Sequence, residues 1–330
     1  RIAGVSRKTR KIADVPDLVP RRFAVFVCCG QGQEAVVWHG DGIAAKHTGS
    51  AIGVLYAASM SLITVHPKTG IQHCHFGHSQ AVDVLEASDD GRWVASVQTA
   101  DCSGPPLIRV WHVDPSGSLR CVSVLACPAL ASVHAAAFDP LAKYIAVAGT
   151  DLQGRQQLRV WDVARIVSGG NTSLLARQLS PDWDIDCLKF SPFEEMQLVS
   201  CGKDSIRFWR VKEDGHIPGR SAVLNSLGRQ AHFTCIAFEF NKCGAPYVPP
   251  DNPIAERRMF VGTSSGQLVQ LSCKDYSVQA VFPLHDGAIL GVSANESCVI
   301  TASADKFVRV WPLDFKSFYL HAKHDSPVVG

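Results

Sequence analysis

One short unit recurs along this chain of 330 residues, and it limits the possible folds more than any other feature. The unit is an apolar strand that ends in tryptophan and a few further residues: LIRVWHVD, LRVWDVA, SIRFWRVK and FVRVWPLD. Trp111, Trp161, Trp209 and Trp311 stand about 50 residues apart, except that the last interval is about twice as long. That interval holds a missing member, GQLVQLSC, with Leu271 at the tryptophan position. Such a period indicates a repeat fold in which each unit packs on its neighbours.

Two further strands and a tight turn precede each tryptophan strand. The nearer strand ends in small residues, as in WVASVQTAD, YIAVAGTD, LVSCGKD, MFVGTSSG and CVITASAD. The farther strand is another alternating one, as in VDVLEAS, VHAAAFDP, IDCLKFSP, FTCIAFEF and ILGVSAN. Period-two alternation with turns rich in Gly, Asp and Ser indicates strands and hairpins, and no helical period is sustained. The fold class is therefore all-β, and four strands per unit predict the blades of a β-propeller with tryptophan between the blades.

Six blades can be marked along the sequence, at 34–78, 79–128, 129–181, 182–231, 232–286 and 287–324. We therefore expect a lead-in over 1–33, blades over 34–324, and the start of a further strand or blade over 325–330. The lead-in and the terminal SPVV supply strands of a seventh blade, or else Ser326–Val329 opens a blade of a second propeller. The Pro-rich stretch Asn241–Arg257 interrupts the fifth blade between its first two strands. We interpret it as a surface excursion, and a binding loop is the alternative.

Charge and hydropathy exclude three classes of protein. The chain has 32 basic and 30 acidic residues, and a net charge of +2 excludes a nucleic-acid binder defined by bulk charge. The longest apolar run, Phe23–Cys29, is much shorter than the roughly 18 residues of a membrane span. An apolar fraction of 46% excludes disorder as the main state. The chain begins at Arg1 rather than Met, so we interpret it as a fragment whose terminus indicates nothing about targeting.

Twelve cysteines occur without any Cys-x-x-Cys pair, the spacing typical of zinc and redox sites. Most lie inside apolar stretches, for example Cys121, Cys187, Cys235 and Cys298, where a thiol behaves as a small hydrophobe. We therefore expect buried, reduced thiols without disulfides, in a cytosolic compartment.

Three motifs resemble chemical sites, and we interpret each as structural. Residues Gly262–Gly266 match a G-x-S-x-G nucleophile elbow, but a strand follows, so they predict a hairpin turn between the second and third strands of a blade. Residues Gly30–Gly32 lack the third glycine and the helix of a dinucleotide loop. His73 and His75 share one face of a strand, but no further metal ligand can be identified. We expect no catalytic residues, no cofactor, no metal and no small-molecule substrate.

His78 belongs to a Gly-His pair that precedes a strand tryptophan, Trp111. A buried hydrogen-bond chain through His78, Ser96, Asp101 and Trp111 would satisfy these polar groups and hold the blade together.

Basic residues gather in two places. The lead-in contains Arg7, Lys8, Arg10, Lys11, Arg21 and Arg22, and the Pro-rich stretch ends in Arg257 and Arg258. We expect these side chains to contact an acidic partner and to make binding sensitive to salt; the alternative is a solvated, flexible lead-in.

The Gly77-His78 and Trp161-Asp162 pairs and the blade pattern resemble those of WD-repeat propellers. LVSCGKDSIRFWRV and TSSGQL resemble segments of the tandem propellers of echinoderm-microtubule-associated-protein-like proteins. RVWPLDFKSFYLHAKHDSPV, RIAGV and GRSAVLNSLGRQAHFTCIAFEF are similar to large centriolar and ciliary WD-repeat proteins of the proteome-of-centriole class. Trp161, Trp209, Trp311 and Asp162 would then be structural blade residues, although only Trp161-Asp162 is an intact Trp-Asp pair.

The resemblance implies a protein of the centriole, basal body or cilium that stabilises microtubule walls. We therefore expect a non-enzymatic cytoskeletal scaffold whose propeller faces bind tubulin or centriolar scaffold proteins, without nucleic-acid or membrane partners. One alternative is a general interaction propeller, an adaptor or substrate receptor without direct tubulin contact. Another is an enzyme that uses the central channel as its pocket, since propellers support many functions.

Overall fold

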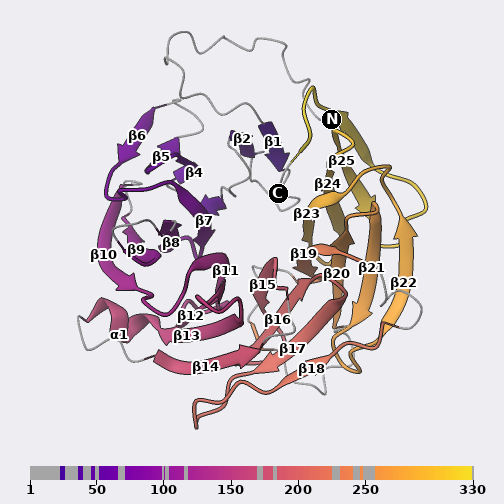
Figure 1. The fold of residues 1–330 in the computed structure, drawn as a ribbon. Coiled ribbons are helices and arrows are strands. Elements are labelled where there is room, and N and C mark those ends of the chain that lie inside the picture. Colours follow the sequence, from indigo (N-terminus) through magenta and orange to yellow (C-terminus); the bar gives the residue numbers. More distant parts are fainter. Residues whose placement is uncertain are drawn as a thin grey trace.

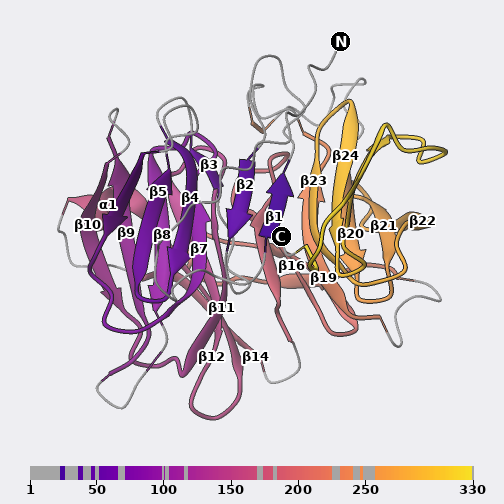
Figure 2. The ribbon, with the colours of Figure 1, turned by 90° about the horizontal axis from the view of Figure 1, so that it is seen from above.

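Most of the chain takes part in one ring of β-sheets. The computed structural model describes residues 23–26, 36–39, 46–48, 52–65, 71–98, 100, 104–114, 118–168, 174–180, 184–224, 231–240, 246–247 and 257–328. Six four-stranded antiparallel sheets surround a central axis, and the first strand of each lies innermost (Figure 1). Seen from the side, the strands run roughly along the axis of the ring (Figure 2). The expected all-β propeller and the six blades marked along the sequence are confirmed, and the described residues form no seventh four-stranded sheet.

The blades follow one another in chain order. The first blade contains β3 (Lys46–Thr48), β4 (Ile52–Ala58), β5 (Ser61–Val65) and β6 (Gln72–His75). The second contains β7 (Val82–Ala87), β8 (Trp93–Gln98), β9 (Leu107–Val113) and β10 (Leu119–Ala126). The third contains β11 (Ser132–Phe138), β12 (Tyr144–Thr150), β13 (Gln156–Asp162) and β14 (Leu174–Ser180).

The remaining three blades repeat this order. The fourth contains β15 (Cys187–Phe190), β16 (Gln197–Gly202), β17 (Ser205–Arg210) and β18 (Gly219–Ser221). The fifth contains β19 (Phe233–Phe238), β20 (Arg258–Thr263), β21 (Gln267–Ser272) and β22 (Val278–Pro283). The sixth contains β23 (Ile289–Ala294), β24 (Cys298–Ser303), β25 (Phe307–Pro312) and β26 (Leu320–Lys323).

Two small elements stand outside this pattern. Strands β1 (Phe23–Phe26) and β2 (Val36–His39) pair in a separate two-stranded sheet, which Figure 1 shows between the first and sixth blades. Strand β2 therefore pairs with the lead-in, and the first blade begins at β3. The one helix of the described ranges is α1 (Val163–Val167), and no helix there is long and apolar enough to cross a membrane.

The strand register shows that the five repeat positions are equivalent. Each tryptophan of the third strand stands opposite an apolar residue of the second strand: Val94 and Trp111, Ile145 and Trp161, Leu198 and Trp209, Val299 and Trp311. Met259 stands opposite Leu271 in the same register, so Leu271 takes the tryptophan position, as predicted.

Each of these residues packs between two blades. Trp111 belongs to an apolar cluster with Leu55 and Leu62 of the first blade, and Trp161 to a cluster with Val97 and Ile108 of the second. Trp209 packs with the third blade, Leu271 with the fourth and Trp311 with the fifth. Burying such side chains between neighbouring sheets joins the blades into one core, because an isolated four-stranded sheet could not cover its own apolar faces.

The same kind of contact closes the ring. Tyr56 of β4 and Val65 of β5 pack against an apolar cluster that contains residues of β24 and β25 together with Val328. Val328 is fully buried, and its N–H donates to the carbonyl oxygen of Ser303 at 3.1 Å. The end of the described chain therefore lies in the seam between the sixth and first blades.

Several local predictions can be compared with the structure. Residues Gly262–Gly266 form the turn between β20 and β21, and the Pro-rich stretch lies between β19 and β20, both as predicted. Eight described cysteines are free, but Cys121 is exposed, contrary to expectation, because its position on the outermost strand β10 has no sheet beyond it. Cys235 and Cys298 are buried, and Cys187 is half-buried.

Candidate functional site

His78 lies in a directional chain of hydrogen bonds inside the second blade. The indole N–H of Trp111 donates to Ser96 Oγ at 2.7 Å, and Ser96 Oγ lies 2.6 Å from His78 Nε2. His78 Nδ1 lies 3.1 Å from Gln98 Oε1, which can only accept. His78 Nδ1–H therefore donates to Gln98, and Nε2 accepts from the Ser96 hydroxyl. Asp101, expected in this chain, lies outside the described residues.

This arrangement suits a neutral imidazole, in which Nδ1 donates and Nε2 accepts. His78 is 7% exposed. Burial lowers the pKa of His78 to about 4, and the nearby Arg109 guanidinium also lowers this pKa, although the hydrogen bond with Gln98 raises it. The charged form is disfavoured in a buried site with a cation beside it.

The sixth blade contains a second chain of the same kind, which sequence reasoning missed. The indole N–H of Trp311 donates to Thr301 Oγ1 at 2.9 Å, Thr301 Oγ1 lies 2.7 Å from His285 Nε2, and His285 Nδ1 lies 2.9 Å from Asp305 Oδ2. Leucine rather than glycine precedes His285, so the Gly-His signal was absent. The remaining signal was the turn aspartate Asp305 in CVITASAD, directly before the strand of Trp311.

The middle blades retain only part of this chain. The indole N–H of Trp209 donates to Ser200 Oγ at 2.8 Å in the fourth blade. The equivalent positions in the third and fifth blades are Val147 and Val261, which carry no hydroxyl. Trp161 is nevertheless 5% exposed, and among the described residues it is held by packing in the apolar cluster between the second and third blades. Asp162, the aspartate of the Trp-Asp pair, caps α1 by accepting from the N–H of Arg165 at 3.0 Å.

The two described basic residues of the expected partner surface are already paired within the chain. Arg258 donates two hydrogen bonds to the Glu239 carboxylate, at 2.6 and 2.9 Å. The Arg257 side chain is 11% exposed and lies 3.8 Å from Glu194 Oε1. Both charges therefore have carboxylate partners within the chain. The lead-in residues Arg7 to Arg22 lie outside the described residues.

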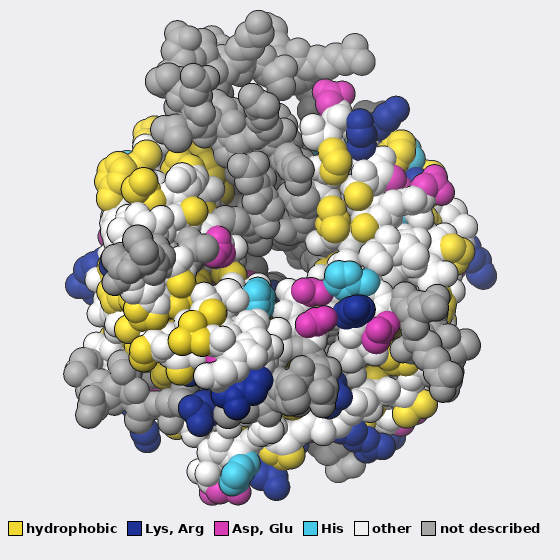
Figure 3. Space-filling view, viewed as in Figure 1, with side chains coloured by type: hydrophobic (Ala, Val, Ile, Leu, Met, Phe, Trp, Pro, Cys, Tyr) yellow, Lys and Arg dark blue, Asp and Glu magenta, His cyan; other side chains and the backbone are white. Residues whose placement is uncertain are grey.

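A polar hollow opens on one face of the ring, near the mouth of the central channel. Acidic, basic and histidine side chains gather there in the space-filling view (Figure 3). The hollow has a volume of about 220 Å³ and lies between the third, fourth and fifth blades. Its lining residues are His134, Gln156, Asp184, Ile185, Asp186, Lys203 and His232. Sequence reasoning missed this set, because its members are spread over three repeats.

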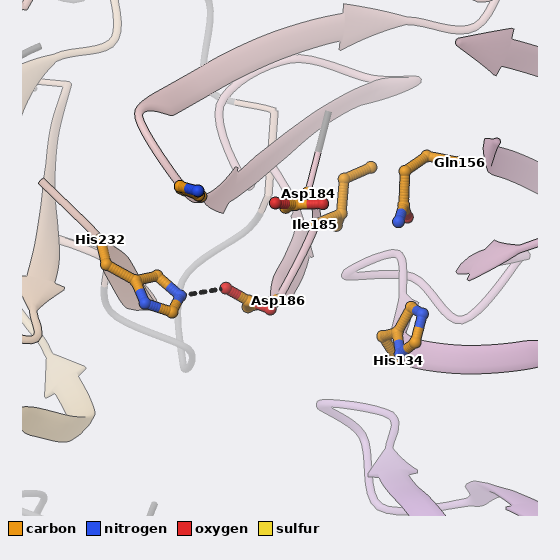
Figure 4. Close-up of a pocket in the computed structure, with 7 residues that line it drawn as sticks. His134, Gln156, Asp184, Ile185, Asp186 and His232 are labelled. Carbon is orange, nitrogen blue, oxygen red and sulfur yellow. Dashed lines mark hydrogen bonds and ion pairs between the residues drawn. The ribbon is translucent and has the colours of Figure 1, made fainter. Parts of the chain in front are cut away.

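Local backbone geometry places the carboxylates of the hollow. Asp184 and Asp186 directly precede the innermost strand β15, and Ile185 between them is buried. A Cβ atom on Gly202 would lie 1.9 Å from the backbone oxygen of Asp184, so only glycine permits this close approach. His232 precedes β19 and lies 2.5 Å from Asp186 Oδ2 through its Nε2 atom (Figure 4).

An ion pair joins two blades that are not neighbours. Lys189 Nζ on β15 lies 3.0 Å from Glu86 Oε1 on β7, and Glu86 is 8% exposed. The innermost strands of the second and fourth blades are thus connected directly.

These hydrogen-bond chains and this register define the chain as a six-bladed β-propeller whose repeats resemble WD repeats. The WD domain, G-beta repeat family matches residues 276–312, which span β22 to β25. A solved chain described as "Structure of U3-55K" has the same fold, with a TM-score of 0.62 and 19% identity over 88% of this chain and 82% of that one.

Among proteins of known name, the chain is similar to Centriole proteome protein 16 of Chlamydomonas reinhardtii, with 29% identity over 83% of this chain. It is 27% identical to human WD repeat-containing protein 90 over 95% of this chain. Mouse Echinoderm microtubule-associated protein-like 3 is 30% identical over 48% of it. The resemblance read from the sequence is thereby confirmed. The chain spans only 13%, 18% and 17% of the length of these three relatives, respectively.

Proposed function

We propose that this propeller is a non-enzymatic scaffold of centriolar and ciliary microtubules, located at the centriole, basal body or cilium. The observation that carries the proposal is the similarity to Centriole proteome protein 16 and WD repeat-containing protein 90 across nearly the whole ring. The ring itself supports it, because every pair of neighbouring blades shares an apolar cluster, and a body of this kind presents partners with fixed surfaces.

The partner in this proposal is tubulin or an inner-scaffold protein. Contact with the acidic surface of tubulin requires local positive charge on a chain whose net charge is only +2. The lead-in supplies it, with Arg7, Lys8, Arg10, Lys11, Arg21 and Arg22. Arg257 and Arg258 are poor contributors because they are matched by Glu194 and Glu239.

A second candidate is an interaction propeller that recruits other proteins without touching tubulin. The acidic side chains at the channel mouth favour it, because an acidic partner would be repelled there.

Microtubule co-sedimentation of the chain tests the first candidate. We expect binding that weakens between low and physiological salt, where the Debye length falls to about 8 Å. Reversing the six lead-in charges should abolish binding. The matched control reverses six exposed charges elsewhere, at Arg120, Arg177, Lys212, Arg220, Lys316 and Lys323, and should bind.

If the wild-type chain does not sediment with microtubules but a tagged form still locates to centrioles, the second candidate replaces the first. If it does neither, the proposed function is wrong.

A further inference from the structure

The hollow at the channel mouth presents more hydrogen-bond acceptors than the chain itself uses. Asp184 is exposed, and its carboxylate has no hydrogen-bond or ion-pair partner among the described residues. Within the described ranges, the Asp186 carboxylate accepts from His232 through one of its two oxygens. Carboxylate oxygens each offer more than one acceptor position, so this pair retains capacity for additional donors.

Gln156 gives an independent indication of a ligand. This side chain is 8% exposed, and its Nε2 donates to Thr150 Oγ1 at 3.0 Å. Its Oε1 atom is buried and has no hydrogen-bond partner in the described part of the chain. Figure 4 shows the amide end of Gln156 directed into the hollow, on the side opposite His232. A buried acceptor without a donor is costly, and a ligand that supplies an N–H removes that cost.

The charges that line the hollow, and the distribution of its acceptor atoms, indicate which kind of ligand would donate to them. Two carboxylates exclude an anion as the favoured ligand, although Lys203 also lines the hollow. No group of three or more His, Cys, Asp or Glu side chains within the described ranges could hold a metal ion. The ligand is therefore a cation with several donors that spread over a wide hollow. A guanidinium presents five N–H donors in a planar fork that matches carboxylates, whereas an ammonium is a compact point charge.

We propose that this hollow binds an arginine side chain presented by a protein partner, held by Asp184, Asp186 and Gln156 Oε1. The inference deepens the proposed function and rests on it only in treating this face as a partner-binding surface. It identifies the partner segment as basic, so that segment is distinct from acidic tubulin surface.

A peptide titration tests the proposal. The probe is an acetylated and amidated peptide, Gly-Gly-Arg-Gly-Gly, and its companions carry citrulline, lysine or glutamate in place of arginine. Binding is measured by isothermal titration or by chemical shifts of the chain. We expect the arginine peptide to bind most tightly, the lysine peptide more weakly, and the citrulline and glutamate peptides not at all.

Variants assign the binding to the hollow. Asp184→Asn with Asp186→Asn should weaken the arginine peptide about tenfold or more, because charge-assisted bonds are lost. The control, Glu296→Gln with Asp314→Asn, removes two exposed carboxylates near the opposite ends of the strands and should bind like wild type. Lys203→Ala should tighten the arginine peptide several-fold, because it removes a competing cation.

Three results would overturn the proposal. The first is no binding of the arginine peptide to the wild-type chain. The second is equal binding by the double asparagine variant and the control. The third is preferred binding of the glutamate peptide that Lys203→Ala abolishes. If the double asparagine variant fails to fold, the direction in which Lys203→Ala changes the affinity for the arginine peptide still decides the test. Because the titration contains no microtubules, its result is independent of the co-sedimentation result.

Discussion

Two histidines, His78 and His285, illustrate how single residues hold this ring together. In the neutral imidazole that burial favours, each accepts a hydrogen bond from a hydroxyl group through Nε2 and donates one through Nδ1. Protonation would turn Nε2 from an acceptor into a donor and would add a positive charge in a buried site. Burial is the main cause that lowers the pKa of both side chains, and the value for His78 is about 4.

The first prediction is therefore a loss of stability in mild acid. The unfolded chain titrates His78 near 6.5, whereas the folded chain titrates it near 4. Between these values the unfolded state binds more protons, so the free energy of unfolding falls as the pH falls. We expect a loss of about 1–3 kcal/mol from His78 across this window. Denaturant titrations at several pH values measure it.

Variants separate this effect from other titrations. His78→Gln with His285→Gln should lower stability at neutral pH and flatten the pH dependence, whereas His216→Gln, at an exposed position, should change neither. A double variant with the wild-type slope would contradict the neutral hydrogen-bond chain.

At the scale of the element, the third strand of each blade provides the inter-blade side chain. We predict that Trp161→Ala lowers the free energy of unfolding by about 3–5 kcal/mol, because it opens a cavity between the second and third blades. Thermal or denaturant unfolding measures the change. An unchanged midpoint would refute the register given above.

Replacing a blade tryptophan by phenylalanine separates the contribution of packing from that of the indole hydrogen bond, because only some of these tryptophans donate to a hydroxyl group. Trp111→Phe leaves Ser96 without its indole donor, whereas the position equivalent to Ser96 in the third blade is Val147, which has no hydroxyl group to lose a partner. We expect Trp111→Phe to cost about 1 kcal/mol more than Trp161→Phe, the usual contribution of one hydrogen bond. Equal losses would show that the indole bonds contribute nothing to stability.

Strand β20 carries an arginine that serves the fold. Removing Arg258 leaves the Glu239 carboxylate, whose side chain is only 9% exposed, without its bidentate partner. We predict that Arg258→Ala lowers stability by about 2 kcal/mol, because an unpaired carboxylate would remain largely buried. Arg120→Ala, at an exposed site, is the control and should stay within about 0.5 kcal/mol of wild type.

At the scale of the whole molecule, the seam between the sixth and first blades depends on Val328. Its side chain is 0% exposed and lies in the cluster that Tyr56 and Val65 contact. We predict that Val328→Ala lowers the free energy of unfolding by about 1–3 kcal/mol. Val223→Ala is the control, since Val223 is 50% exposed. Similar values for both variants would mean that Val328 does not close the ring.

The repeat made the blades predictable from the sequence, but it gave no indication of the hollow, whose residues come from different repeats. Alternation and the tryptophan period fix which strand pairs with which, so even Leu271 could be placed at a tryptophan position. The hollow could not be found this way, because His134, Asp184 and His232 meet only when three units curve around the axis. The pairing of Arg258 with Glu239 was equally hidden, since a sequence shows where charges stand but not which of them meet.

The seam at Val328 also has a mechanical consequence. Neighbouring blades elsewhere are joined by the continuous chain, so a pull across them is carried by covalent bonds as well as by packing. In the described part of the chain, the first and sixth blades meet through packed apolar side chains, and no strand of one leads directly into the other. Tension along the circumference of the ring would therefore part it at this seam first. A propeller that bears load in an assembly is strongest when the pull runs across the opposite side of the ring.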